Sequence, residues 1–282
     1  MSVVVFGAGG QLGRDLLRVF SRTEDVFPYD HHDVDITNRD AVMKCMQSVN
    51  PAWVINAAAY TDVEKSEDDR DAAFRVNETG ARVVAQCAHV QNVPVVYFST
   101  DFVFDGTAYT PYEPEDAIEP RGAYAQSKAA GEAAVRSVSP RHYIVRTAWL
   151  YGPGGNNFVE KILNAASVRP SLRVVTDEIG SPTHTLDLAR ATAALVCTGQ
   201  YGTYHAVNEG SCSRFAFAES IVREAGLATQ IEPCLASDYP SKAPRPSYSV
   251  MSNAKLKAAC GIEMPQWQTA LAEYMKRREI QE

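Results

Sequence analysis

The sequence predicts an α/β fold in which a doubly wound parallel sheet is joined to a smaller C-terminal lobe. Three observations predict it. Short, almost continuously apolar segments recur along the first half of the chain, helix-length segments separate them, and this alternation weakens after about residue 150. Strands that are apolar on both sides are typical of parallel sheets covered by helices on both faces.

Each expected element follows from a local pattern. Valine, isoleucine and aromatic residues cluster in five expected strands, at residues 2–6, 26–29, 52–58, 93–99 and 142–149. Helical periodicity predicts helices between them, at residues 10–20, 37–49, 68–91 and 124–138. Thr37, followed three residues later by Asp40, resembles a capping box at the start of the second helix.

After residue 150 the patterns predict a second, smaller part of the chain. Helices are expected there at residues 158–168, 185–198, 214–225 and 265–278. A short strand is expected at residues 202–207. We therefore expect a sheet domain at residues 1–150 and a mainly separate lobe at residues 151–282, with some interleaving of the two.

Composition excludes several classes of partner. The 282-residue chain has a formal net charge of −7 and no run of Lys or Arg, so we expect neither nucleic acid nor a membrane surface as a partner. The N-terminus lacks the pattern of a signal peptide, and no apolar stretch approaches the roughly 20 residues that cross a bilayer. These features predict a cytoplasmic protein. The six scattered cysteines, without a CxxC pair, predict reduced and mostly buried thiols.

Three glycines lie between the first strand and the first helix: Gly7, Gly10 and Gly13. This order lets a backbone approach a pyrophosphate at a helix N-terminus, although a tight turn without a ligand is the alternative. Asp30 follows at the distance from which an acidic residue accepts hydrogen bonds from the adenosine ribose of NAD. Residues 35–36, Asp-Ile, suit an adenine site, or else Asp35 caps the next helix. Residues 1–150 are therefore a predicted NAD(P)-binding Rossmann domain.

Polar and small residues follow the third and fourth strands. The small residues 56–59 leave room for a flat ligand, with close helix packing as the alternative. Tyr124 and Lys128 share one helix face, so we expect Lys128 to lower the pKa of the Tyr124 phenol and make it a general acid for a ketone. A surface pair is the alternative. The hydroxyl of Ser99 or Thr100, at the end of the fourth strand, is expected to bond the same carbonyl oxygen.

Two further stretches are candidates for substrate contacts. Trp149 follows the fifth strand, where it suits packing against a sugar or base, or else against the core between the lobes. In "STDFVFDG", residues 102–104 are expected to line or support a pocket, and Asp105-Gly106 to form a turn.

These motifs together make the chain resemble the dTDP-4-dehydrorhamnose reductase family of the extended short-chain dehydrogenase/reductase superfamily. The resemblance covers nearly the whole chain and rests on "GAGGQLG", "VINAAAYTDVEKSE", "STDFVFDG", "YAQSKAAGE", "RTAWLYGPGGNNF", "DEIGSPT" and "RPSYSVMSNAKL". It implies that NADPH or NADH reduces the 4-keto group of dTDP-4-dehydro-β-L-rhamnose, giving dTDP-L-rhamnose.

The resemblance also implies roles for single residues. The implied catalytic group is Thr100, Tyr124 and Lys128, and the implied substrate contacts are Thr100, Asp101 and Trp149. Implied cofactor contacts are Gly10, Gln11, Leu12, Asp30, Asp35, Ile36, Ala59, Tyr60 and Thr61, to which the patterns above add Gly7, Gly13, Ala58, Tyr124 and Lys128.

Some members of this family bind Mg²⁺ at a dimer interface through acidic residues, one of them early in the first helix. Asp15 has that place in this chain, and Asp177 and Glu178 in "DEIG" are candidate partners. The resemblance thus allows a homodimer with bound Mg²⁺.

Two other functions stay open. A nucleotide-sugar dehydratase would use an Asp-Glu pair after the threonine, whereas Phe102 follows Asp101 here; an epimerase would need no added NAD(P)H. A non-catalytic regulatory subunit, such as the β subunit of methionine adenosyltransferase, would retain the fold and the cofactor site. The presence of Thr100, Tyr124 and Lys128 gives no reason for a loss of catalysis.

Overall fold

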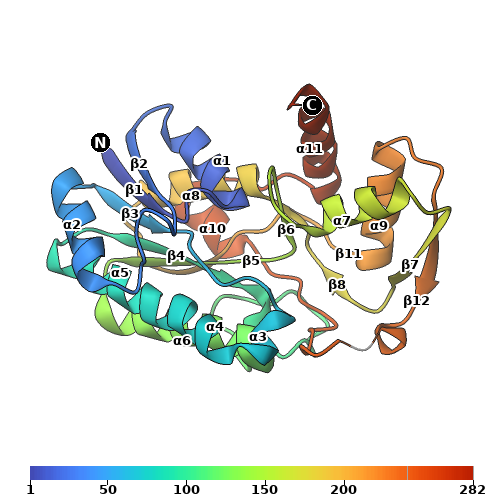
Figure 1. The fold of residues 1–282 in the computed structure, drawn as a ribbon, viewed down its shortest axis with the longest axis horizontal. Coiled ribbons are helices and arrows are strands. Elements are labelled where there is room, and N and C mark those ends of the chain that lie inside the picture. Colours follow the sequence, from blue (N-terminus) through green and yellow to red (C-terminus); the bar gives the residue numbers. More distant parts are fainter. Residues whose placement is uncertain (240, 282) are drawn as a thin grey trace.

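A sheet of six parallel strands forms the centre of the larger part of the molecule (Figure 1). The computed structural model describes residues 1–239 and 241–281. The strands run in the order β10-β5-β4-β3-β1-β2. Their bounds are β1 Ser2–Phe6, β2 Asp25–Tyr29, β3 Trp53–Asn56, β4 Val95–Thr100, β5 His142–Thr147 and β10 Gly202–His205.

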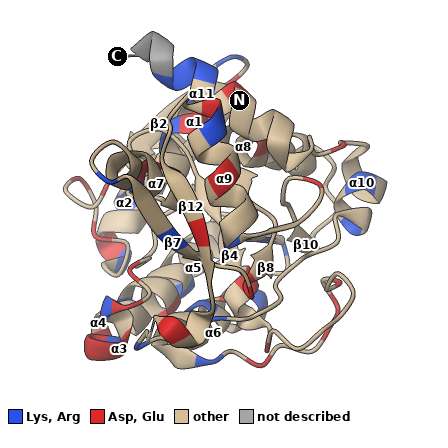
Figure 2. Cartoon of the chain, turned by 90° about the vertical axis from the view of Figure 1, so that its right-hand side faces the viewer, with Lys and Arg blue, Asp and Glu red and all other residues tan. Residues whose placement is uncertain are grey.

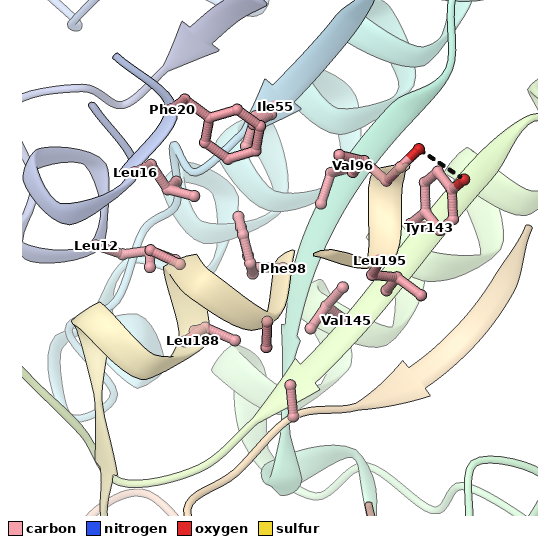
Figure 3. Close-up of a cluster of buried hydrophobic side chains, with 14 of the residues drawn as sticks. Leu12, Leu16, Phe20, Ile55, Val96, Phe98, Tyr143, Val145, Leu188 and Leu195 are labelled. Carbon is pink, nitrogen blue, oxygen red and sulfur yellow. Dashed lines mark hydrogen bonds between the residues drawn. The ribbon is translucent and has the colours of Figure 1, made fainter. Parts of the chain in front are cut away.

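The central strands bury side chains on both faces, as their apolar sequences predict. In β1, Val3 and Val5 enter one core cluster, whereas Val4 and Phe6 enter the cluster on the opposite face. Figure 3 shows the first cluster, where Leu12, Leu16 and Phe20 pack toward β3, β4 and β5 together with Leu188 and Leu195. The predicted α/β class with a parallel sheet is confirmed.

Helices cover the two faces of the sheet (Figure 1). One face carries α1 (Gln11–Phe20) and α8 (Thr185–Val196), with α10 (Ala254–Cys260) beside them. The other face carries α2 (Arg39–Val49), α5 (Ala81–Val90) and α6 (Gly122–Val138). Because β10 and α8 both come from beyond residue 150, the second half of the chain completes the large sheet. The boundary at residue 150 stays a prediction.

The expected helix at residues 68–91 is divided in the structure. Its parts are α3 (Lys65–Asp68), α4 (Arg70–Phe74), a π-helical turn η1 (Arg75–Gly80) and α5. Asp69 interrupts the helix because its φ of −129° is not helical and its side chain caps α4. Helix α2 also differs from expectation, since Asn38 rather than Thr37 accepts the first backbone N–H groups.

The smaller part of the chain has its own core around Tyr151, Phe217 and Trp267. Its helices are α7 (Phe158–Ala166), α9 (Arg214–Glu224) and α11 (Trp267–Gln281). Short strand pairs and two 3₁₀ turns complete the fold: β6 Leu150–Tyr151 with β9 Thr183–His184, β7 Ser171–Val175 with β12 Gln230–Cys234, β8 Ile179–Gly180 with β11 Cys212–Ser213, η2 Asp101–Val103 and η3 Ala236–Asp238.

Surface charge and cysteines agree in part with the sequence analysis. Figure 2 shows charges of both signs on one face, with acidic residues on α3 and basic residues on α11.

All six cysteines are free thiols, but only Cys87 and Cys234 are buried and Cys197 is exposed, so the expectation of mostly buried thiols is wrong. Within residues 1–239 and 241–281, no helix is long and apolar enough to span a membrane.

A buried ion pair joins α6 to the sheet. Arg146 on β5 donates to both carboxylate oxygens of Glu132 on α6, at 2.8 Å each, and both side chains are almost fully buried. Arg146 also donates to the carbonyl of Pro114 at 3.1 Å. The pKa of Glu132 is lowered, with the hydrogen bonds and charge of Arg146 outweighing the effect of burial.

We predict that Arg146→Met lowers the free energy of unfolding by about 3–5 kcal/mol, because it leaves the buried Glu132 carboxylate with only the longer, 3.5 Å ion pair to the half-exposed Arg136. The double variant Glu132→Leu with Arg146→Met should lose much less, since no unpaired charge remains. Urea unfolding monitored by circular dichroism measures both. Arg173→Met, which removes an exposed ion pair with Asp238, is the control and should change little. Equal losses in the single and double variants would contradict this account.

Candidate active site

The glycine turn meets the end of β3 at the point where the strand order of the sheet reverses. Beside β1 lie β2 on one side and β3 on the other, and ligands of open parallel sheets bind at such a point. Gly7 has a φ of +79°, and a Cβ atom on it would lie 2.4 Å from the backbone nitrogen of Ala58. A Cβ on Gly13 would lie 2.2 Å from the Gly7 carbonyl oxygen. Both glycines are therefore required for the close packing of this turn.

Gly10 has a different role, because a Cβ there would meet only the Gly7 carbonyl oxygen, at 3.4 Å. It is the N-cap of α1, and no side chain caps that end of the helix. An uncapped helix N-terminus beside a glycine turn offers backbone N–H groups to an anion. Gln11 instead links this turn to the later chain, donating to Leu150 and accepting from Asn157. The Leu12 side chain is in the core, so only its backbone faces the turn.

The loop after β2 places Asp30 across from the glycine turn. Its Oδ2 atom would lie 3.6 Å from a Cβ atom on Gly9. The backbone N–H of His32 donates to Oδ1 at 2.7 Å, and this bond lowers the pKa of Asp30. An ionised carboxylate at this position fits the ribose hydroxyls of a dinucleotide. The glycine turn, the uncapped helix and Asp30 together fit an NAD(P) cofactor.

The two residues expected at the adenine are held by the protein itself. Asp35 Oδ1 accepts from both the backbone N–H and the hydroxyl of Thr37, so it forms a local turn and does not cap α2. Ile36 is buried against Gly80 of η1. The structure places both beside the predicted site, and their contacts with a cofactor stay a prediction.

The loop after β3 is fixed by Asn77, a fully buried residue of the π-helical turn η1. Its amide accepts from the Tyr60 N–H at 2.9 Å and donates to the Tyr60 carbonyl at 3.0 Å. It also donates to Ser127 on α6, whose hydroxyl bonds the Tyr124 carbonyl. Ala58 and Ala59 are half-buried and Thr61 is exposed at the mouth of this loop. The sequence patterns missed Asn77, which ties the predicted cofactor loop to the predicted catalytic helix.

Thr100 and Asp101 form a tight turn at the end of β4. The Thr100 hydroxyl accepts from the N–H of Phe102 and donates to Asp101 Oδ1 at 3.0 Å. Asp101 is only 2% exposed, and its Oδ2 atom makes no hydrogen bond of good geometry within the described residues, although the nearby Ser249 hydroxyl also acts on this carboxyl group. Burial raises the pKa of Asp101. A buried carboxylate oxygen without a partner is suited to accept a hydrogen bond from a ligand.

Tyr124 faces this turn from the first part of α6. Its ring packs edge-on against Phe102, with the ring centres 5.6 Å apart. Burial raises the pKa of Tyr124 to about 12, the neighbouring Thr100 hydroxyl lowers it in part, and the Asp101 charge adds to the rise. The expectation that Lys128 lowers this pKa is therefore not met in the ligand-free protein. At neutral pH the phenol holds its proton.

Lys128 explains that difference, because its ammonium group is directed into the protein. Nζ donates to the Phe98 carbonyl oxygen at 2.6 Å and lies 4.2 Å from the centre of the Tyr97 ring. Only 3% of the residue is exposed, and burial lowers its pKa to about 7. Lys128 is thus positioned by β4, and the alternative of a surface Tyr–Lys pair does not hold.

Trp149 is held in an unusual conformation directly after β5. Its φ is +46°, which is uncommon for any residue other than glycine. A Cβ atom on Gly180 would lie 2.5–2.8 Å from three atoms of the indole, so only glycine lets the ring lie this close to β8. Gly180 stands in a motif that the resemblance used, but no sequence pattern revealed this contact. The role of Trp149 in binding a substrate stays a prediction.

The acidic residues considered for Mg²⁺ are not gathered in the structure. Asp15 accepts from the Thr185 hydroxyl and faces three arginines, at positions 18, 190 and 277. Asp177 accepts instead from the backbone of Ala236, and Glu178 lies beside Arg214. Among the described residues, no group of three His, Cys, Asp or Glu could hold a metal ion. These residues therefore form no metal site within the described part of one chain, and a site shared between two chains stays a prediction.

The glycine turn yields a prediction about cofactor binding. Gly10→Ala should fold like the wild type, because its φ of −72° suits alanine, yet bind NADPH at least about tenfold more weakly because the methyl group occupies the anion site. Gly13→Ala should lower the melting temperature as well, because its methyl group meets backbone. Thermal unfolding and a fluorescence titration with NADPH measure the two effects. Binding by Gly10→Ala as tight as that of the wild type would count against this site.

Buried Lys128 yields a prediction about stability. Lys128→Met should raise the free energy of unfolding at pH 6 by about 1–2 kcal/mol, because the folded wild type must bury a charge there. From pH 7 to about 10 the unfolded wild type holds a proton that the folded state lacks, so wild-type stability should rise with pH. The variant should lack this rise. Denaturation at pH 6, 8 and 9.5 tests it, with exposed Lys44→Met as the control, and an identical pH slope in Lys128→Met would refute it.

Comparisons with known proteins agree with this geometry. A family model described as "RmlD substrate binding domain" matches residues 1–280. The spore coat polysaccharide biosynthesis protein SpsK of Bacillus subtilis is 39% identical over 277 residues, which are 98% of this chain and 97% of that protein.

Two solved structures are similar over their whole length. A dTDP-4-dehydrorhamnose reductase from Clostridium acetobutylicum is 39% identical with a TM-score of 0.96, covering 99% of this chain and 100% of that one. The dTDP-4-dehydrorhamnose reductase of Bacillus anthracis, solved in complex with NADP, is 37% identical with a TM-score of 0.95, covering 98% and 99%. The chain therefore belongs to the RmlD substrate-binding domain family, among homologues of dTDP-4-dehydrorhamnose reductase within the extended short-chain dehydrogenase/reductase superfamily.

Proposed function

We propose that this protein is an NAD(P)H-dependent reductase that converts dTDP-4-dehydro-β-L-rhamnose to dTDP-L-rhamnose. The observation that carries the proposal is the meeting of Thr100, Asp101 and Tyr124 at the carboxyl edge of the sheet. The glycine turn after β1 opens at the same edge, because parallel strands all end there. Similarity to reductases acting on this substrate supports the choice of sugar.

Each residue of the site has a separate role in the reduction of the ketone. A bound nicotinamide supplies the hydride. Tyr124, protonated at neutral pH, donates its proton to the oxygen that becomes the new hydroxyl. Thr100 stands beside Tyr124, and its hydroxyl proton, which bonds Asp101 Oδ1 in this structure, would turn to the same oxygen. The unpartnered Oδ2 of Asp101 accepts from a hydroxyl of the sugar, and Trp149 packs against it.

Other residues hold the cofactor in this proposal. The pyrophosphate would be held by the three glycines of the turn, Gly7, Gly10 and Gly13, and by the backbone of Gln11 and Leu12. Asp30 would bind the adenosine ribose. Six further residues complete the lining of the cofactor site: Asp35, Ile36, Ala58, Ala59, Tyr60 and Thr61. The expected role of Lys128 in orienting the nicotinamide ribose would require its side chain to leave the Phe98 carbonyl, which it bonds in this structure.

The nature of residue 102 favours reduction over dehydration. A dehydratase of this superfamily would need a second carboxylate after Asp101, and the structure has the Phe102 ring packed against Tyr124 instead. A non-catalytic subunit would not need its catalytic residues to be arranged for a reaction. In this structure, however, Thr100 and Tyr124 lie close enough to interact. Co-purification with a catalytic partner, together with no turnover of the ketosugar, would support the regulatory alternative.

The choice between NADPH and NADH depends on Asp30. Its ionised carboxylate favours the free ribose hydroxyls of NADH and disfavours a ribose phosphate. His31 and His32, exposed beside it, are placed to offset that charge. A relative was solved with NADP, so both cofactors belong in the assay.

We predict that Tyr124→Phe lowers kcat by at least about 10²-fold, because it removes the proton donor and leaves the ring packing intact. The Kd for NADPH should stay within about twofold. Tyr204→Phe is the matched control, since Tyr204 lies on the edge strand β10 and its hydroxyl bonds the carbonyl of Gln200, which precedes that strand. Steady-state kinetics with dTDP-4-dehydrorhamnose and with its GDP- and UDP-linked counterparts measure both activity and substrate choice. Near-wild-type turnover by Tyr124→Phe would refute the assignment.

A further inference from the structure

Arg214, the first residue of α9, lies over the face of Trp149. Its guanidinium carbon is 3.5 Å from the centre of the indole and 5.0 Å from that of Phe158. The side chain is only 13% exposed. A planar guanidinium at this distance from an aromatic face is attracted to it. Arg214 thus covers one face of a ring whose other contacts include the backbone of β8 at Gly180.

The same guanidinium faces two carboxylates. Its Nε lies 3.5 Å from Glu178 Oε2, and its charge also acts on Asp101. Burial lowers the pKa of Arg214 to about 10, while Glu178 and Asp101 oppose this change. The nearby Arg245 acts against Arg214 but is paired with Glu64 at 3.0 Å. Arg214 remains charged at neutral pH.

Few groups favour the ionised form of the Asp101 carboxyl. Burial raises its pKa, while the hydroxyls of Ser249 and Thr100 and the charge of Arg214 lower it. Tyr124 faces it as well and is neutral at physiological pH. The charge of Arg214 is thus one of these influences that lower the pKa of Asp101.

We propose that Arg214 is a positioning residue that sets the affinity for the sugar by fixing the Trp149 ring. This deepens the proposed function and rests on it. The strained backbone of Trp149 fits this role, because a residue with positive φ needs surrounding contacts to hold it. Lysine would keep the charge but lose the planar contact with the indole.

Kinetics of two variants test the proposal. Arg214→Lys should raise KM for the ketosugar about tenfold, equivalent to about 1.4 kcal/mol, with kcat within about threefold and KM for NADPH unchanged. Arg214→Gln should raise this KM at least as much, because it removes the cation from the indole face. Arg141→Lys and Arg141→Gln are the controls, since Arg141 lies near the Tyr201 ring outside the site. Unchanged KM for the ketosugar in both Arg214 variants would overturn the proposal.

A second readout does not depend on turnover. Acrylamide quenching of tryptophan fluorescence in the ligand-free protein should increase in Arg214→Lys, because the face of Trp149 becomes accessible. That increase should vanish when Trp149→Phe is the background, which assigns it to this ring. If the wild type fails to reduce the ketosugar but the quenching behaves in this way, the proposed function is wrong and the Arg214–Trp149 contact stands. Equal quenching with and without Arg214 would refute the contact.

Discussion

The site depends on the way α6 is bound to the sheet by two buried basic side chains, Lys128 and Arg146. Tyr124, Lys128 and Glu132 are spaced four residues apart, so they share one face of this helix. Lys128 donates to the Phe98 carbonyl of β4, and Arg146 of β5 donates to Glu132. These contacts fix the helix against both strands, and Tyr124 is thereby held beside the turn that ends β4.

This arrangement accounts for the unusual ionisation in the site. Burial between helix and sheet lowers the pKa of Lys128 to about 7 and raises that of Tyr124 to about 12. Each shift favours the neutral form, as a low-dielectric environment requires. A neutral phenol is the form that donates a proton. Burial thus keeps the phenol protonated at neutral pH, as the proposed reduction of a ketone requires.

Much of the fold could be predicted, because the apolar runs of strands and the helical spacing of apolar residues are both visible in short stretches of sequence. Strand β1 was placed at its observed ends and α6 within two residues at its start, since apolar runs and helical spacing depend only on neighbouring residues. The π-helical turn at Asn77 could not be predicted, because its side chain bonds Tyr60 and Ser127, far away in the sequence. Arg214 and Gly180 were missed for the same reason, as their significance lies in contact with Trp149.

The site residues were predictable by type and not by interaction. Thr100, Asp101 and Tyr124 meet as expected at one edge, because parallel strands end together. The expectation that Lys128 lowers the pKa of Tyr124 is not met, since sequence spacing showed that the two share a helix face but not that Lys128 bonds the Phe98 carbonyl of β4. The magnesium ligands did not gather, because Thr185 and three arginines surround Asp15. The homodimer and the cytoplasmic location stay predictions.

The central claim is that this edge of the sheet reduces a nucleotide-linked ketone. Absorbance at 340 nm, followed while a limiting amount of dTDP-4-dehydrorhamnose is added to the protein with excess NADPH or NADH, tests it most directly. The account predicts the loss of one reduced cofactor per ketosugar and the appearance of an equal amount of dTDP-L-rhamnose. Sugar conversion without loss of absorbance, or no conversion with either cofactor, would contradict it.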